Sequence, residues 1–401
     1  MPPELPRFCA RERTVVRQAN GLAFSSFNGP SGDSEHTITI EAPGELSLPR
    51  QLDVIAQRYA EAMQALRLPP ESAIFRRLYL SDAANQATLV RDSSLFQEPL
   101  DSPVAVSLVQ QPPLPGGKVA MLAYHLDSPT PLTKRRVPPG HVIVEKRGLG
   151  HLWSTRLCAT NTDRPSPAAD QTREVFGRLI DVLADNGAGL AENCVRTWIY
   201  VKDVDVFYQE INDARSALFE QHGLTRDTHY IASTGIEGAC AHRYDVVLMD
   251  AYSILGLQPA QVSYLSAYDR LCATKDYNVT FERGTRIAYA DRAHHFISGT
   301  ASIDPAGQVV HPGDVPRQLE RALGNVEALL RSGDARLEDM THLIVYLRDP
   351  SDHPLIEAIL AERFPEMPRL VVRGAVCRPD WLVEVEGIAI APNDAPALPE
   401  F

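Results

Sequence analysis

The segment Val195-Arg-Thr-Trp-Ile-Tyr-Val-Lys-Asp203 occurs in three diverged forms along the chain, and this repetition decides the fold. Its counterparts are Phe75-Arg-Arg-Leu-Tyr-Leu-Ser-Asp82 and His342-Leu-Ile-Val-Tyr-Leu-Arg-Asp349. Each is an apolar run in which a tyrosine precedes an aspartate by three residues. Such runs are typical of strands that are buried on at least one face. We therefore predict three copies of one structural unit.

Helices and further strands surround each of these runs in the same order. Apolar residues recur at three- and four-residue steps within 52–66, 172–184 and 315–330, which predicts an amphipathic helix before each strand. Another strand-like run follows at 119–124, 244–249 and 381–390. Copies two and three contain an additional predicted helix, at 206–219 and 354–364. Each unit is thus predicted as an α/β (α+β) sandwich with helices on one face of a mixed sheet.

The 401 residues are enough for several compact domains, and we divide them at the repeats. The expected units are 1–135, 140–258 and 262–392, followed by a tail at 393–401. Proline-rich stretches at 112–117, 129–139 and 256–261 are expected to act as joints.

Charge and apolar content limit the classes of partner. The net charge of −12 argues against nucleic-acid binding, which needs a basic face, and a site for an anion would require a local arginine cluster. No stretch reaches 18 apolar residues, so we expect no membrane span, and the amino-terminal sequence lacks the pattern of a signal peptide.

The cysteines and histidines indicate a cytoplasmic protein without a metal or other cofactor. No C-x-x-C pair occurs in this long chain, which predicts reduced thiols, and the histidines lack metal-ligand spacing. The six cysteines are Cys9, Cys158, Cys194, Cys240, Cys272 and Cys377.

Two carboxylates stand out in the segment Trp381-Leu-Val-Glu-Val-Glu386. In a strand, Glu384 and Glu386 point to the same face, with valines on the other. A buried carboxyl with a like-charged neighbour has its neutral form favoured, which suits a general acid at neutral pH. A solvated strand face is the alternative interpretation.

The preceding run, at 370–377, also alternates, so we expect Arg373, Ala375 and Cys377 to share a face. Arg373 would then need a partner, either a bound carboxylate or Glu386. Cys377 is expected to line a pocket, because no activating histidine is evident.

Two loops of small residues follow strands, at 232–238 and 298–301, and could let a ligand approach the backbone. Neither is a phosphate-binding loop, so nucleotide binding has no support.

Several ordered strings carry a resemblance to a known family. They are Phe296-Ile-Ser-Gly299, Asp304-Pro-Ala-Gly307, Gly313-Asp-Val315 with Gln318, Leu323 with Asn325-Val326, and Val383-Glu-Val-Glu-Gly-Ile-Ala389. Together they resemble the Rid (YjgF-like) superfamily. The resemblance implies chorismate-mutase-like units in a trimeric arrangement around a central barrel, with sites between units. One chain with three units could supply that arrangement internally, as a pseudo-trimeric monomer or within a homo-oligomer.

The last two units are similar to the chorismatase branch of that superfamily. The matching strings are Arg196-Thr-Trp-Ile-Tyr200, Asn212 with Arg215, Ala232-Ser-Thr-Gly-Ile236, Phe281 with Arg283, and Val376-Cys-Arg378 before the Glu384 strand. The resemblance implies removal of pyruvate from chorismate, with Glu384 as the acid. Gly299 and Cys377 fall on the two positions that distinguish subtypes, and this pair resembles the 3-hydroxybenzoate-forming one. The expected substrate-binding residues are Arg196, Tyr200, Arg215, Thr234, Gly235, Arg283, Thr300, Arg369 and Arg373.

Two other functions stay open at this point. Arg369 lies 15 residues before Glu384, a spacing that resembles Rid-type imine or enamine deaminases, in which an arginine clamps a carboxylate substrate. A non-catalytic protein that binds small metabolites between its units is the other alternative. In each case the expected partner is a small anionic carboxylate.

Overall fold

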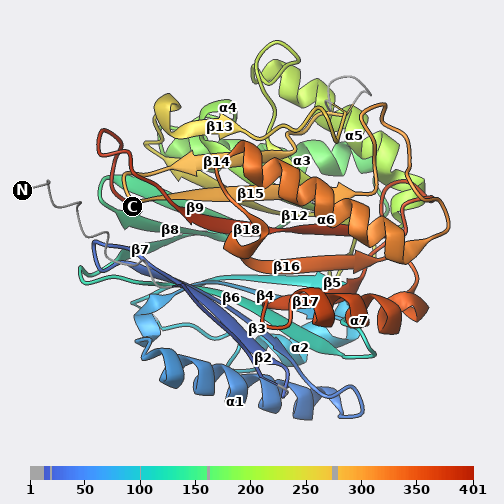
Figure 1. The fold of residues 1–401 in the computed structure, drawn as a ribbon, viewed down its shortest axis with the longest axis horizontal. Coiled ribbons are helices and arrows are strands. Elements are labelled where there is room, and N and C mark those ends of the chain that lie inside the picture. Colours follow the sequence, from blue (N-terminus) through green and yellow to red (C-terminus); the bar gives the residue numbers. More distant parts are fainter. Residues whose placement is uncertain (1–12, 19, 100, 160–162, 273–278) are drawn as a thin grey trace, which may run out of the picture.

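The computed structural model describes residues 13–18, 20–99, 101–159, 163–272 and 279–401, and these form three six-stranded mixed sheets. Cys9 and the first twelve residues of the expected unit 1–135 lie outside the described residues. Helices cover the outer side of each sheet, and the three sheets meet in the centre of the molecule (Figure 1). The predicted helices on one face of a mixed sheet are confirmed.

The first unit is described by its elements in chain order. They are β1 (Arg13–Arg17), β2 (Leu22–Asn28), β3 (Ser34–Glu41), α1 (Leu48–Leu66), η1 (Pro70–Ser72), β4 (Ala73–Leu80), α2 (Ala83–Arg91), β5 (Ala105–Gln110) and β6 (Val119–Asp127).

The second unit repeats this order. Its elements are β7 (Thr133–Val137), β8 (His141–Lys146), β9 (Leu149–Cys158), α3 (Ala168–Asp185), α4 (Leu190–Asn193), β10 (Cys194–Val201), α5 (Val204–Gln221), β11 (Ala232–Glu237) and β12 (Val247–Leu255).

The third unit does so again. It comprises η2 (Pro259–Gln261), β13 (Val262–Tyr264), β14 (Gly284–Ala288), β15 (Arg292–Ala301), α6 (Val315–Ser332), η4 (Leu337–Asp339), β16 (Met340–Leu347), η5 (Pro350–Asp352), α7 (His353–Arg363), β17 (Arg369–Arg373) and β18 (Val383–Pro392).

Strand order is the same in all three sheets. Within each unit the strands lie side by side as first, second, third, sixth, fourth and fifth, which gives β1-β2-β3-β6-β4-β5 in the first sheet. The fourth and fifth strands are parallel and the other neighbours are antiparallel. The three tyrosine-containing runs identified from the sequence are β4, β10 and β16, the fourth strand of each unit. Triplication of one unit therefore accounts for the fold.

Local sequence explains where the helices begin. The Asp314 side chain accepts a hydrogen bond from the backbone N–H of Arg317 at the start of α6, and Pro316 occupies the first turn. Asp82 caps α2 in the same way through Asn85. The sequence predicted a helix at this point only in copies two and three. The shorter α2 escaped prediction because its buried face consists of small or polar residues and one valine.

Several predicted strands have different limits in the structure, and the run predicted at 244–249 is β12, Val247–Leu255. The last strand begins at Val383 rather than Trp381. The preceding strand, β17, ends at Arg373, so the prediction that Arg373, Ala375 and Cys377 share a strand face is wrong. The chain leaves the sheet at this point because the carbonyl of Ala375 accepts a hydrogen bond from Glu237 of the second unit.

The Pro-rich stretches have different places in the chain. The stretch 112–117 connects β5 to β6 inside the first unit and is therefore not a joint between units. Strands change sheet between Asp127 and Thr133 and between Leu255 and Val262, which places the other two stretches near the unit boundaries.

A ring of three backbone hydrogen bonds joins the units. In each unit, the backbone N–H of the last residue of the fifth strand donates a hydrogen bond to a backbone carbonyl of the next unit. The bonds are Gln110 to Ala239 (2.7 Å), Glu237 to Ala375 (3.0 Å) and Arg373 to Pro112 (2.8 Å). The units are thus arranged with pseudo-threefold symmetry. Among the described residues the ladders remain three separate sheets, so they do not form the closed barrel that the family resemblance implied.

The main hydrophobic core lies where the three sheets meet. It contains residues of every unit, including the three repeat tyrosines Tyr79, Tyr200 and Tyr346, which have no exposed surface. Burial of these large aromatic rings in the shared core contributes to the apolar contact that holds the units together.

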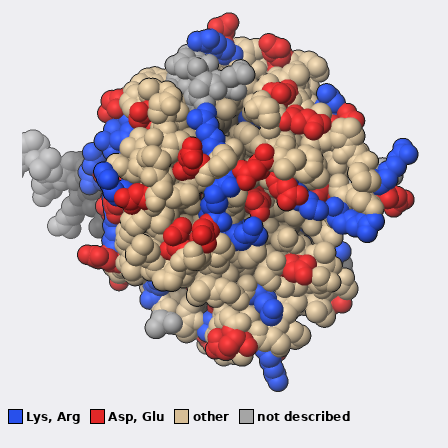
Figure 2. Space-filling view, turned by 90° about the vertical axis from the view of Figure 1, so that its right-hand side faces the viewer, with Lys and Arg blue, Asp and Glu red and all other residues tan. Residues whose placement is uncertain are grey.

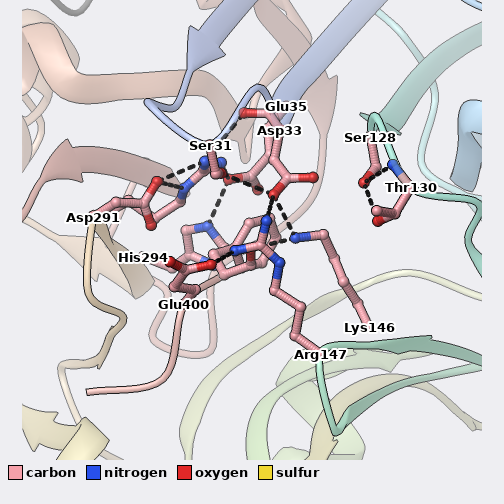
Figure 3. A network of polar contacts seen from close by, with 12 residues as sticks. Ser31, Asp33, Glu35, Ser128, Thr130, Lys146, Arg147, Asp291, His294 and Glu400 are labelled. Atoms are coloured by element: carbon pink, nitrogen blue, oxygen red, sulfur yellow. Dashed lines mark hydrogen bonds and ion pairs between the residues drawn. The ribbon is translucent and has the colours of Figure 1, made fainter. Parts of the chain in front are cut away.

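The end of the described chain ties the three units together (Figure 3). Lys146 and Arg147 of the second unit approach Asp33 of the first at 2.8 and 2.9 Å, and Arg292 of the third approaches Glu35 at 2.7 Å. Within this network the Phe401 ring is 3% exposed and packs against rings of the second and third units. The expected tail 393–401 is therefore partly built into the inter-unit core.

Acidic and basic side chains are interspersed on the face shown in Figure 2, in keeping with a mixed surface. Of the helices in the described ranges, none has the length and apolarity needed to cross a membrane.

Candidate active site

The predicted acid lies in a cleft between the second and third units. The cleft has a volume of about 340 Å³. Helix α5 forms one wall, β15 and the 377–384 segment form the other, and the segment 279–283 before β14 closes an end. The lining residues are Tyr208, Gln209, Asn212, Val279, Phe281, Arg283, Gly299, Ala301, Ile303, Cys377, Arg378, Trp381 and Glu384.

Glu384 is the carboxyl group of this cleft. It lies on β18 between Ala301 of β15 and Tyr346 of β16, and its side chain is 6% exposed. Burial raises its pKa to about 8, and the neighbouring charge of Glu386 acts in the same direction, whereas Arg283 and Arg196 lower it. Glu384 therefore carries a proton at neutral pH, unlike a solvated strand carboxylate.

Gly299 makes room for this acid. A Cβ atom at position 299 would lie 2.2 Å from Oε1 of Glu384 and 3.0 Å from Cγ2 of Thr234. Real Cβ atoms do not approach so closely, so a side chain here would displace Glu384. The prediction of small-residue loops is wrong in its local structure, because 298–301 lie within β15 and 232–237 form β11. Gly299 nevertheless allows the acid to approach the strand backbone closely.

Glu386 has a different environment although it lies on the same strand face. It forms an ion pair with Arg196 at 2.6 Å and accepts hydrogen bonds from Trp198 (3.0 Å), Tyr346 (2.9 Å) and the hydroxyl of Thr234. Thr234 in turn accepts the N–H of Gly299 at 2.8 Å. This network joins the second and third units directly behind Glu384, so Glu386 holds the site together and does not face the cleft.

Arginine side chains border the cleft beside the acid. Arg283 and Arg378 line it, and each guanidinium lies over an aromatic ring, at 5.2 Å from that of Phe281 and 4.8 Å from that of Trp381. These two positive groups can meet an anionic ligand.

Arg215 lies behind the α5 wall of the same cleft. It is buried, and it donates to Asn212 at 2.7 Å and to Thr280 at 3.2 Å. It thereby fixes Asn212, which does line the cleft. Gly235 also supports this wall, because a Cβ there would lie 3.0 Å from the ring of Tyr208.

Four of the predicted site residues face the cleft, namely Glu384, Cys377, Gly299 and Arg283. Arg196, Arg215, Thr234 and Gly235 form its supporting layer. The remaining predictions do not reach it. Tyr200 and Thr300 are buried elsewhere, with the Thr300 hydroxyl donating to the carbonyl of Ser298.

Two predicted arginines have structural partners outside the cleft. Arg369 donates to Glu357 at 2.6 Å, and Arg373 lies 3.6 Å from Glu237. The alternative pairing of Arg373 with Glu386 is wrong, because Arg196 takes that carboxylate.

Sequence reasoning missed several cleft residues, including Tyr208, Arg378 and Trp381. Arg378 and Trp381 stand beside the Cys377 and Glu384 motifs, and this adjacency was a usable signal. Tyr208 comes from the neighbouring unit, so only the inter-unit arrangement reveals it.

Cys377 has the character of a cleft-lining thiol. Burial, with the nearby Glu384, raises its pKa to about 12, which disfavours the thiolate that a nucleophile requires. Within the described ranges, no group of three or more His, Cys, Asp or Glu side chains is arranged to hold a metal ion.

Comparisons with known proteins show the family to which the chain belongs. Residues 286–391 match the family model described as Endoribonuclease L-PSP. The chain is 33% identical over 96 residues to the 3-aminoacrylate deaminase RutC of Acinetobacter baylyi, covering 23% of this chain and 76% of that protein. With its repeated fold and matching third unit, the chain belongs to the Rid superfamily.

Two further similarities point to one branch of that superfamily. The 3-hydroxybenzoate synthase of Streptomyces hygroscopicus is 26% identical over 260 residues, which cover 58% of this chain and 73% of that protein. A crystal structure of a chorismatase has the same fold, with a TM-score of 0.60 and 20% identity over 80% of this chain and 93% of that one. The chain is therefore a chorismatase-like member of the superfamily, as its sequence motifs predicted.

Proposed function

We propose that this enzyme removes pyruvate from chorismate, or from a close enolpyruvyl cyclohexadiene acid, to give a hydroxybenzoate. The observation that carries the proposal is Glu384, a buried carboxyl in a 340 Å³ inter-unit cleft whose pKa is raised to about 8. Similarity to a 3-hydroxybenzoate synthase over more than half of the chain supports the same substrate class.

The chemistry needs a neutral carboxylic acid. Glu384 donates its proton to the terminal methylene of the enolpyruvyl ether, which creates an oxocarbenium ion at the ether carbon. A ring hydroxyl attacks that carbon, and the bond between this carbon and the original ether oxygen breaks, which leaves that oxygen on the ring as a hydroxyl. The ring carbon–oxygen bond of the attacking hydroxyl then breaks, and pyruvate leaves with this oxygen as its ketone oxygen. Loss of a ring proton returns the proton to Glu384 and makes the ring aromatic. Chorismate minus pyruvic acid has the atoms of hydroxybenzoic acid, so this route consumes no net water.

The substrate has two carboxylates, and the cleft offers two guanidiniums. We assign Arg283 and Arg378 to these carboxylates because both line the cleft. Arg215 acts indirectly by holding Asn212. Gly299 and Cys377, the pair that resembles the 3-hydroxybenzoate-forming subtype, both face the cleft, which supports 3-hydroxybenzoate as the product.

The test is incubation of the purified chain with chorismate. We expect pyruvate, measured by coupling to lactate dehydrogenase, and 3-hydroxybenzoate in equal amounts, identified by chromatography against the other hydroxybenzoate isomers. Absence of pyruvate over a long incubation, with the protein shown to be folded, would contradict the proposal. Equal amounts of pyruvate and a dihydrodiol would retain the acid chemistry but reassign the subtype.

A deaminase of imines or enamines is the second candidate, because 96 residues of the chain are 33% identical to a 3-aminoacrylate deaminase. Its predicted arginine, Arg369, pairs with Glu357 and does not line the Glu384 cleft. Ammonia release from 2-aminoacrylate faster than the spontaneous rate would favour this candidate. Saturable binding of chorismate without any turnover would favour a metabolite-binding protein.

A further inference from the structure

A second cleft lies between the first and second units and has nearly the size of the first. Its volume is about 320 Å³, compared with 340 Å³. Helix α2, β5, β9 and the segment 240–248 line it, which are the counterparts of the elements around the Glu384 cleft. The lining residues are Ala83, Ala87, Arg91, Leu108, Arg156, Cys158, Cys240, Ala241, His242, Asp245 and Leu248.

Strand register shows which positions correspond. Leu248 pairs with Tyr200 and Cys158, just as Glu384 pairs with Tyr346 and Ala301. An apolar side chain therefore stands where the first cleft has its acid. The second cleft has lost the group on which the proposed chemistry depends while keeping its volume.

Arg156 corresponds to Gly299, because each lies two residues before the partner of the acid position. Its backbone has a positive φ of 57°, and its N–H donates to Asp250 at 3.0 Å. With this left-handed backbone, Arg156 lines the second cleft at the strand position that corresponds to Gly299. A cation thus lines the second cleft where the first has room for a carboxylic acid.

The charge of Arg156 is poorly balanced. Among the described residues its buried Nε has no hydrogen-bond partner, and the nearby carboxylate of Asp250, which raises its pKa, is already paired with Arg77. The guanidinium lies 4.9 Å from the ring centre of Phe96. Arg91 lines the same cleft and, after burial, is the largest influence that lowers the pKa of Arg156. Two like charges side by side favour an anionic partner.

The rest of the cleft sets the chemical class of that partner. Ala83, Ala87, Leu108 and Leu248 supply apolar surface. Asp245 is buried, and one of its carboxyl oxygens accepts a hydrogen bond from Cys240 at 3.4 Å. The other oxygen lies 3.8 Å from His242 and has no hydrogen-bond partner among the described residues. A ligand that places a carboxylate on the arginines and a hydrocarbon ring on the apolar wall fits this lining.

We infer that the cleft between the first and second units is a second binding site, which takes a small ring carboxylate and leaves it chemically unchanged. This inference goes beyond the proposed reaction, because it depends on Arg156, Arg91 and the apolar wall rather than on Glu384. A carboxylate held there would contact the first unit through α2 and the second through β9, so its binding bears on how these units are joined.

Half-buried cysteine thiols line both clefts, so their rates of chemical modification can report ligand binding in each cleft separately. Cys158 and Cys240 line the second cleft, and Cys377 lines the first. The protein is treated with methyl methanethiolsulfonate in the presence of 3-hydroxybenzoate, and modification at each cysteine is followed by peptide mass spectrometry. At ten times its dissociation constant, the ligand should slow modification of Cys158 and Cys240 about tenfold. The neutral analogue 3-hydroxybenzamide should protect them much less.

Two variants connect the protection to the arginines. Arg156→Gln removes the half-buried cation, and we expect about tenfold weaker protection of Cys158 and Cys240, with that of Cys377 unchanged. Arg91→Gln alters an exposed helix position, so it remains informative if the first variant is unstable. Absence of protection in the wild type, or protection unaffected by both variants, would overturn the inference. Failure to release pyruvate from chorismate would count against the proposed function alone.

Discussion

The two inter-unit clefts have the same scaffold and opposite chemical character. Each is built from the helix after the fourth strand of one unit and from the third and sixth strands of the next. At two corresponding positions the pair Glu384 and Gly299 is replaced by Leu248 and Arg156. The comparison teaches that the fold supplies clefts of similar volume at these two interfaces, whereas two side chains decide whether each contains an acid or a cation.

Removing the acid should have the largest effect. We expect Glu384→Gln to lower kcat for pyruvate release about 10²- to 10⁴-fold, the usual contribution of a general acid. Leu248→Met, a volume-conserving change at the corresponding position of the second cleft, should leave the rate unchanged. Both variants should keep the wild-type circular dichroism spectrum. A Glu384→Gln protein with the wild-type rate would remove the distinction between the clefts.

The buried ion pairs beside the two clefts should be equally important for stability. Glu386 pairs with Arg196, and Asp250 pairs with Arg77 at 2.9 Å. Glu386→Gln and Asp250→Asn each leave a buried guanidinium without its carboxylate, which costs about 3–5 kcal/mol of unfolding free energy in denaturant titrations.

Of these two variants, only Glu386→Gln should change the pH dependence of activity. The charge of Glu386 raises the pKa of Glu384, so its neutralisation should move the alkaline loss of activity to lower pH. If Asp250→Asn moved this loss equally, the effect would be a general one of destabilisation.

Filling the space beside the acid should reduce activity by a smaller factor. A methyl group at position 299 would clash with Glu384, and we expect Gly299→Ala to lower kcat about tenfold to a hundredfold by misplacing the acid. Arg156→Ala, at the corresponding position, should leave kcat unchanged.

In the double variant Gly299→Ala, Cys377→Ala we expect a larger share of dihydrodiol than of hydroxybenzoate. An unaltered product ratio would show that these two positions do not determine subtype here.

The last prediction concerns the dependence of activity and stability on pH. Because Glu384 must be protonated, kcat should be constant at lower pH and fall as pH rises through about 8. The pKa of Glu384 is about 8 in the folded protein and 4.5 in the unfolded chain, so between these pH values only the folded protein holds the proton. The unfolding free energy that this group contributes therefore falls as pH rises from about 4.5 to 8.

Glu384→Gln lacks this proton and provides the control. The melting temperature of this variant should rise relative to that of the wild type as pH increases from 5 to 8. Each unit by which the pKa of Glu384 is raised on folding corresponds to about 1.4 kcal/mol of unfolding free energy. A constant difference in melting temperature across that range would mean that Glu384 has an ordinary pKa.

The sequence predicted the repeated unit well because its signals are local. The tyrosine-containing strands and the amphipathic helices follow from alternation and periodicity within single segments. The acid was also accessible, since Glu384 lies in a paired-carboxylate strand. Its separation from Glu386 depended on resemblance to a family, and the structure supplies the physical reason in the four donors around Glu386.

Contacts between units explain the predictions that failed. Arg369 and Arg373 looked available in a strand pattern, yet Glu357 and Glu237 lie beside them in the folded chain. Tyr208 contributes to the cleft from a unit that ends more than a hundred residues before Glu384. Such juxtapositions arise from how whole units dock, and no spacing within one segment encodes them.

The ring of three backbone hydrogen bonds also has a consequence for how the protein could change over generations. In an assembly of three identical chains, every substitution appears at all three interfaces at once. Here each interface is encoded by its own stretch of one chain, although the bonds Gln110 to Ala239, Glu237 to Ala375 and Arg373 to Pro112 keep the docking alike. A mutation can therefore remove an acid at one interface without changing the residues of the next interface. Because the three units are covalently linked in one chain, each cleft can evolve separately.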